Sequence, residues 1–327
     1  MRTHSITLLL TAAAVFAAGV WILRADAMSQ APLPGQTPSF DDTFWDHWGD
    51  GHAELAGYRL TFPRYGEQRT GSAVAIFVTE TFTNELRVKA DLGNHPESDT
   101  FPVMKLNLLE DFPTGIYDYN LMTSAFSALE PVNGYPAGTP TKVAFSSQEW
   151  CGLVHGQYLF NEDGIDYTLH SYFDGEADQR RELPTRERAL VEDALLLWAR
   201  GFAGSVLEPG ESITTPMLKG LQRSRLQHEP PTWQETTFSR AADTEEVEVP
   251  AGAFTVNRYT AEIAGDRTWT ILVEEEHPHR IIKWTTSDGQ AAELTGAKRL
   301  KYWQMNANRF RETVEQLGLE VRTPGSM

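Results

Sequence analysis

The sequence has a single cysteine, Cys151, among 327 residues. One thiol cannot form a disulfide within the chain, so the fold must be stabilised by its hydrophobic core. Basic residues are also few, with 28 Lys and Arg against 45 Asp and Glu and a formal net charge of −17. This surplus of negative charge repels nucleic-acid phosphates and anionic lipid head groups. We therefore expect no nucleic-acid partner and no peripheral membrane binding.

Long apolar runs are absent from the sequence except at the N-terminus, where residues 6–23 form one. Arg2 precedes this run and Ala25-Asp26-Ala27 follows it, which is the pattern of a secretory signal with a small-x-small cleavage site. We expect cleavage after Ala27, a flexible leader over residues 28–43, and a periplasmic or secreted location. An uncleaved run of about 18 residues can just span a bilayer, so an N-terminal membrane anchor is the alternative.

Most of the remaining chain alternates between apolar and polar residues with a period of two. The alternation is clear at residues 58–62, 74–78 and 104–108, and it predicts half-buried antiparallel strands. Turn dipeptides such as Asp163-Gly164 and Asp288-Gly289 separate later strands, because glycine tolerates the positive φ of tight hairpins. The sequence therefore predicts a mainly β fold, a curved antiparallel sheet or half-barrel built of hairpins.

Two amphipathic helices are predicted to cover this sheet. The first follows Pro184, and its apolar stripe comprises Leu190, Ala194, Leu197 and Trp198. The second lies near the C-terminus, with Gly318 as its cap, and its apolar positions are Trp303, Phe310, Val314 and Leu317. Each half of the chain thus reads as hairpins with a helix, so two units, 44–183 and 184–327, or one long curved sheet would fit.

The first candidate site is a metal centre within residues 44–54. Carboxylates and imidazoles that can ligate Zn²⁺ or another divalent ion gather there: Asp46, His47, Asp50, His52 and Glu54. On a strand His47 and His52 would point to opposite sides, so only a loop through the nearby glycines could bring His47, His52 and Glu54 together. The alternative is a solvated acidic turn without a cofactor.

The second candidate site is a thiol centre in residues 145–178, where Cys151, Glu149, His155 and His170 occur together. A thiolate nucleophile needs a base within hydrogen-bond reach and a group that orients the base. Cys151, His155 and Glu149 are therefore candidate catalytic residues. Free cysteine is also among the most buried residue types, and beside Trp150 and Leu153 we expect Cys151 to pack in the core.

Two weaker patterns lie in the C-terminal half. His277 and His279 would share one face of a strand, as a metal pair requires, whereas Pro278 between them favours a charged hairpin end that blunts a sheet edge. Aromatic residues could line a ligand-binding sheet face, although core packing explains them equally well. These aromatic residues are Trp233, Trp269, Trp284, Trp303, Tyr259 and Tyr302.

Four motifs resemble a family of uncharacterised exported bacterial proteins, a likeness that covers nearly all of the chain after residue 27. They are Phe44-Trp-Asp-His-Trp-Gly-Asp-Gly51, Pro63-Arg-Tyr-Gly66, Ser147-Gln-Glu-Trp-Cys-Gly152 and Leu300-Lys-Tyr-Trp-Gln-Met305. Some members of that family are labelled septum formation inhibitor Maf. True Maf proteins are cytoplasmic nucleotide pyrophosphatases with a Ser-Pro-Arg-Arg phosphate loop, which this sequence lacks, so that activity is not carried over.

The C-terminal half also resembles a bacterial periplasmic domain of unknown function, at Val249-Pro-Ala-Gly-Ala-Phe-Thr-Val256 and in the hairpin of residues 269–284. That resemblance implies a curved antiparallel sheet loosely like the lipoprotein-carrier fold. We therefore expect a non-catalytic periplasmic binding or carrier module for an apolar small molecule or an envelope protein. The alternative is a hydrolase, metal-dependent through His47, His52 and Glu54 or thiol-based through Cys151 and His155. An enzyme needs those side chains in one open pocket, and a carrier needs a wide apolar groove.

Overall fold

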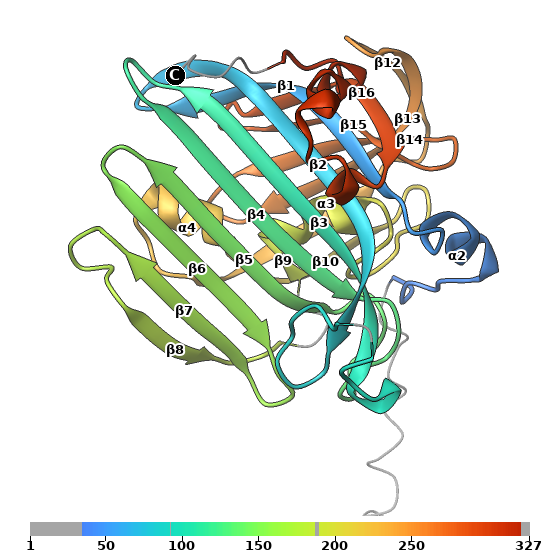
Figure 1. The fold of residues 1–327 in the computed structure, drawn as a ribbon. Helices are drawn as coiled ribbons and strands as arrows, with labels where there is room; N and C mark the ends of the chain where they lie inside the picture. The colour runs from blue at the N-terminus through green and yellow to red at the C-terminus, as the bar shows by residue number, and fades with distance from the viewer. Residues whose placement is uncertain (1–34, 92, 187–189, 322–327) are drawn as a thin grey trace, which may run out of the picture. The chain divides into compact units, whose positions relative to one another are not determined.

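The computed structural model describes residues 35–91, 93–186 and 190–321, and in these residues a single sheet of sixteen strands dominates the fold (Figure 1). Strands β1 to β8 span Ala53–Arg64, Glu67–Thr83, Thr100–Pro113, Asp118–Ala128, Pro140–Glu149, Gly152–Phe160, Ile165–Ser171 and Gln179–Leu183. Strands β9 to β16 span Leu190–Val191, Ser212–Leu218, Trp233–Arg240, Glu245–Val249, Gly252–Ile263, Thr268–Glu274, Ile281–Thr286 and Ala291–Leu300.

The described helices are short. The α-helices are α2 (Asp42–Trp48), α3 (Leu195–Ala199) and α4 (Leu221–Gln227), and the 3₁₀ helices are η1 (Glu97–Asp99), η2 (Glu192–Ala194), η3 (Tyr302–Gln304) and η4 (Asn308–Leu317). Within the described residues, no helix combines the length and the apolar character needed to cross a membrane. The predicted signal segment, residues 1–27, lies outside the described residues.

The sheet joins the two halves of the chain through its first and last strands. The strand order is β8-β7-β6-β5-β4-β3-β2-β1-β16-β15-β14-β13-β11-β10-β9, with β12 paired to β13. Neighbouring strands are antiparallel except β9 and β10, which are parallel. Strands from residues 44–183 and from residues 184–327 thus belong to one long sheet. The predicted fold class, a mainly β protein with a large open curved sheet, is confirmed.

The period-two pattern sorts residues between the two faces of the sheet. In β4, Tyr119, Leu121, Thr123 and Ala125 are buried on one side, here called the inner face, while Asn120, Met122 and Ser124 are more exposed. The inner faces of many strands share one hydrophobic core with α3. Gly289 has φ +101°, as the tight turn predicted there requires, whereas Gly164 closes its turn without a positive φ.

The long amphipathic helix predicted after Pro184 is not found in the structure. The chain instead forms β9, the 3₁₀ turn η2 and only five residues of α-helix in α3. All residues of α3 are buried, so the helix packs on all sides within the core and has no polar face. This burial arises because neighbouring inner faces surround the segment, a long-range effect that a helical stripe does not reveal. The four residues of the predicted apolar stripe are indeed buried, but the segment does not form an amphipathic helix.

The C-terminal segment does cover the sheet, as a 3₁₀ helix. Strand β1 and strand β16 contact η4, whose Leu317 is buried in a small second core with Leu55 and Ile76. Gly318 ends the helix with φ +67°, as predicted. In the predicted leader of residues 28–43, Gln36 and Val206 exchange backbone hydrogen bonds of 3.0 and 2.8 Å.

Candidate functional site

A cavity of about 140 Å³ lies between α4 and the inner face of β5 to β7, and it is called the α4 pocket below. In Figure 1, α4 lies behind β5 and β6. The lining residues are Phe145, Gly156, Tyr167, Leu169, Gly175, Glu176, Gln179, Arg181, Leu221, Ser224, Arg225, His228, Glu229 and Pro230. The sheet therefore supplies an apolar floor, and α4 with the segment after β7 supplies a polar edge.

Two buried carboxylates hold the start of α4 over the sheet. Asp193 accepts a hydrogen bond from the Leu221 backbone N–H at 2.8 Å, and Glu192 accepts one from the Gly220 N–H at 3.2 Å. These N–H groups have no partner inside the helix, so the carboxylates from η2 satisfy them. Burial raises the pKa of Asp193 to about 7. Because α4 is anchored at this end, its other residues are placed over β5 and β6.

Arg225 of α4 is the most buried charge of the pocket. Its Nη2 donates to Glu149 Oε1 at 3.1 Å, and both side chains are only 2% exposed. Its guanidinium lies 4.0 Å from the centre of the Phe173 ring. The buried Arg225 Nε makes no hydrogen bond within the described residues. The Arg225 guanidinium is therefore held at the pocket wall, and its Nε–H, unpartnered within the described residues, is free to donate to a ligand.

His228 extends the same network to the opposite edge of the pocket. Arg225 Nη1 lies 3.3 Å from His228 Nε2, and His228 Nδ1 lies 2.5 Å from Glu176 Oε1. Arginine can only donate, so His228 Nε2 accepts a hydrogen bond from Arg225 and His228 Nδ1–H donates one to Glu176. Ser171 donates to the second oxygen of Glu176 at 3.0 Å. The result is a continuous chain of polar groups, Glu149, Arg225, His228 and Glu176, above an apolar floor.

A glycine sets how closely α4 approaches the sheet. A Cβ at Gly156 of β6 would lie 3.2 Å from Leu221 Cδ2, tighter than ordinary van der Waals contact. The missing side chain therefore allows Leu221 to pack directly on β6. Two residues further along β6, Tyr158 donates a hydrogen bond to the Lys219 carbonyl, just before the start of α4, at 3.0 Å.

The structure does not assemble the predicted thiol centre. Cys151 is exposed in the turn between β5 and β6, so the prediction that it packs in the core was wrong, because the turn projects beyond the sheet. A hydrogen bond to the Glu149 carboxylate raises the pKa of the Cys151 thiol. His155 is exposed on the outer face, between buried Val154 and Gly156, and lies opposite His170. Glu149 and His155 thus lie on opposite faces.

The predicted metal ligands do not converge on one site, and Glu54 and His52 interact with other side chains of the protein. Glu54 of β1 accepts hydrogen bonds from Arg200 at 2.6 and 3.2 Å, and His52 Nδ1 lies 3.2 Å from an Asp50 carboxylate oxygen. His47 belongs to α2, and burial lowers its pKa to about 4. In the described parts of the chain, no group of three or more His, Cys, Asp or Glu residues could hold a metal ion.

The remaining predicted patterns are parts of the scaffold. His277 and His279 lie in the turn between β14 and β15, where they form a hairpin end, and the His277 ring packs edge-on against His47 at 4.5 Å. Trp269 and Trp284 are buried in the main core, and Trp269 Nε1 donates to Glu192 at 2.9 Å. Trp269 and Trp284 therefore serve core packing, whereas Trp303 is 47% exposed.

Sequence reasoning missed the residues on α4. Arg225 lies 76 positions from its partner Glu149, and His228 lies 52 positions from Glu176. No spacing rule connects such positions, because tertiary contact alone brings them together. The excess of acidic residues around Glu176 was the one local signal in this region.

Comparisons with known proteins were made for the whole chain. A scan against protein-family models finds no match, and a search of curated proteins finds no relative. Among solved structures, the chain is similar to the crystal structure of a beta-barrel-like protein of domain of unknown function DUF1849 from Brucella abortus. The two are 11% identical with a TM-score of 0.43, over 76% of this chain and 98% of the other. The resemblance to Maf-labelled exported proteins stays a prediction.

Proposed function

We propose that this protein is a non-catalytic exported binding module whose ligand site is the α4 pocket. The observation that carries the proposal is the cavity of about 140 Å³ with an apolar floor and a few converging polar groups. Ligand pockets typically have this composition, with the polar groups fixing the orientation of the ligand. Export rests on the sequence of residues 1–27, and membrane anchoring is the alternative.

The size and lining of the pocket define the ligand class. An apolar cavity of about 150 Å³ holds one benzene molecule, so the α4 pocket has room for one ring-sized group. Phe145, Tyr167 and Leu169 would contact that group, while Arg225 and His228 at the edge suit a polar substituent. A compact, partly polar molecule fits better than a long acyl chain, because α3 and the core side chains occupy the inner face of the sheet elsewhere.

The hydrolase alternative gains no support from the geometry. Cys151 and Glu149 are hydrogen-bonded to each other, but His155 lies on the opposite face of the sheet. Glu54 is held by Arg200 rather than directed into a pocket. A thiol whose pKa is raised is also a weaker source of thiolate at neutral pH.

Filling the pocket tests the proposal. Phenol and indole serve as probes, with hexadecanoate as the long-chain comparison, and the melting temperature is measured at rising concentrations of each. Leu169→Trp fills the pocket and should abolish the rise in melting temperature with the ring probes. Leu153→Trp adds the same bulk on the exposed outer face and should leave the rise intact. An equal response from both variants would show that ring compounds bind elsewhere.

A further inference from the structure

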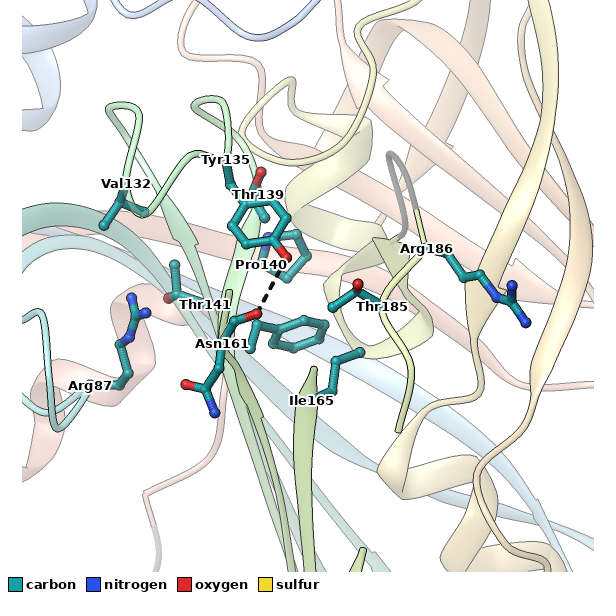
Figure 2. A pocket seen from close by; sticks show the side chains of 11 residues that line it. Arg87, Val132, Tyr135, Thr139, Pro140, Thr141, Asn161, Ile165, Thr185 and Arg186 are labelled. Carbon is teal, nitrogen blue, oxygen red and sulfur yellow. Dashed lines mark hydrogen bonds between the residues drawn. The ribbon is translucent and has the colours of Figure 1, made fainter. Parts of the chain in front are cut away.

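A second cavity, of about 30 Å³, lies at the ends of β5 to β7 away from the α4 pocket (Figure 2). The loop after β2, the connection between β4 and β5, and the turn between β6 and β7 contribute to it. Its lining residues are Arg87, Val132, Tyr135, Thr139, Pro140, Thr141, Phe160, Asn161, Ile165, Thr185 and Arg186. Arg87 is 3% exposed, although it lies in a loop.

Arg87 is buried without a counter-ion from the described residues. Its guanidinium makes no hydrogen bond or ion pair there, its Nε is fully buried, and its aromatic neighbour Phe101 has its ring centre 5.3 Å away. Three other buried guanidinium groups each have a buried carboxylate partner. These pairs are Arg200 with Glu54, Arg225 with Glu149 and Arg267 with Glu192.

An unpaired buried charge costs free energy, which a bound anion would offset. Burial lowers the pKa of Arg87 and likewise that of Lys142, whose Nζ donates to the Arg87 carbonyl at 3.2 Å. Lys142 is not among the residues that line the cavity, so Arg87 is the buried cation that lacks an anionic partner there, in a protein whose net charge is −17.

Three hydroxyl groups of this cavity donate their protons within the protein. Tyr135 donates to the Glu162 carbonyl at 2.8 Å, Thr139 to the Pro136 carbonyl at 2.8 Å, and Thr141 to the Phe126 carbonyl at 3.3 Å. The Arg186 side chain points away from the cavity (Figure 2). Arg87 is thus the cationic donor that remains for a ligand among the described residues.

We propose that the Arg87 cavity binds the carboxylate group of a small organic anion. The planar guanidinium matches the two oxygens of a carboxylate. A volume of about 30 Å³ holds about two water-sized atoms, which suits those two oxygens. The apolar walls formed by Val132, Phe160 and Ile165 offer no hydrogen bonds to the additional oxygens of an inorganic phosphate. This site is separate from the α4 pocket and does not depend on the function proposed there.

The test measures melting temperature against carboxylate concentration at constant ionic strength. Acetate and butyrate represent free acids, a short peptide with a free C-terminus and its C-terminal amide represent a carboxylate on a larger partner, and inorganic phosphate and chloride are comparisons. Butyrate should raise the melting temperature more than phosphate or chloride. A stronger effect of the free-acid peptide than of butyrate, with none from the amide, would assign the carboxylate to a peptide partner.

Variants of Arg87 decide whether this residue carries the effect. Arg87→Met should lose the response to butyrate and, without carboxylate, should melt no lower than the wild type, because the unpaired charge is gone. Arg87→Lys keeps the positive charge but lacks the planar guanidinium with its two parallel N–H donors, so the affinity for butyrate should fall about tenfold. Arg186→Met is the matched control and should respond like the wild type.

Three results would overturn the proposal. They are a wild-type melting temperature that no carboxylate raises, a phosphate effect as large as that of butyrate, and an Arg87→Met protein that still responds. If Arg87→Met does not fold, the comparison of anions on the wild type and the affinity of Arg87→Lys still decide the outcome.

Discussion

Arg200 and Glu54 form a bidentate ion pair in the interior, with hydrogen bonds of 2.6 and 3.2 Å and side chains 0% and 2% exposed. The Arg200 guanidinium also lies 4.3 Å from the centre of the Phe77 ring and donates to the Pro278 carbonyl at 2.9 Å. The pair therefore links the end of α3 to β1 and to the turn before β15.

Removing one member of this pair should be strongly destabilising. Glu54→Gln leaves the Arg200 guanidinium buried without its counter-ion, and we expect a loss of about 3–5 kcal/mol in the free energy of unfolding. Chemical denaturation measures this loss. Glu293→Gln is the control, because it removes the charge from partly exposed pairs with Arg59 and Lys283 and should cost less than about 1 kcal/mol. Similar losses in both variants would contradict the structural role given to the buried pair.

Glu110 should make stability depend on pH. Burial raises its pKa to about 7 from an ordinary value of 4.5, and its carboxyl accepts hydrogen bonds from Gln222 and Gln290. The folded state therefore holds a proton that the unfolded state releases between pH 4.5 and 7. The stability from Glu110 is complete below pH 4.5 and is lost as pH rises through 7, by on the order of 1–3 kcal/mol.

Glu110→Gln should flatten that dependence. Unfolding by denaturant at several pH values between 4 and 8 gives the slope for the wild type and the variant. Asp193, whose pKa is also raised to about 7, should keep part of the slope in the variant. An unchanged slope would mean that Glu110 does not hold its proton at neutral pH.

Cys151 should be accessible to alkylating reagents but should react with them slowly. The thiol is exposed in the folded protein, and its hydrogen bond with Glu149 raises its pKa. A maleimide reagent should label the native protein without denaturant, at a rate that still rises with pH at pH 9. Cys151→Ala should melt at the wild-type temperature, since the side chain fills no core space. Protection of the native thiol from labelling would restore the core-packing interpretation.

The contact between η4 and β1 should be sensitive to a single methyl group. A Cβ at Gly57 would lie 2.3 Å from the Leu317 carbonyl oxygen, so Gly57→Ala should displace η4 and cost about 1–3 kcal/mol. Limited proteolysis should then cut the C-terminal segment faster. Gly115→Ala meets nothing within 4 Å and provides the control. Equal proteolysis rates would show that η4 tolerates the added group.

The sequence by itself determined the local elements. Alternation with a period of two predicted strands such as those around Tyr58 and Leu106, since each strand exposes one side to the core and the other to solvent. Glycines marked turns such as that at Gly289. These features depend on neighbours a few positions apart, and so they can be read along the chain.

Only the tertiary structure decided where these elements meet. The pairing of β1 with β16, the burial of α3 on all sides, and the contact of Arg225 with Glu149 join positions far apart in sequence. The same long-range packing left Cys151 on a projecting turn and Arg87 in the interior. Burial and pairing of side chains depend on which faces of the sheet come together, and a local pattern does not specify that choice.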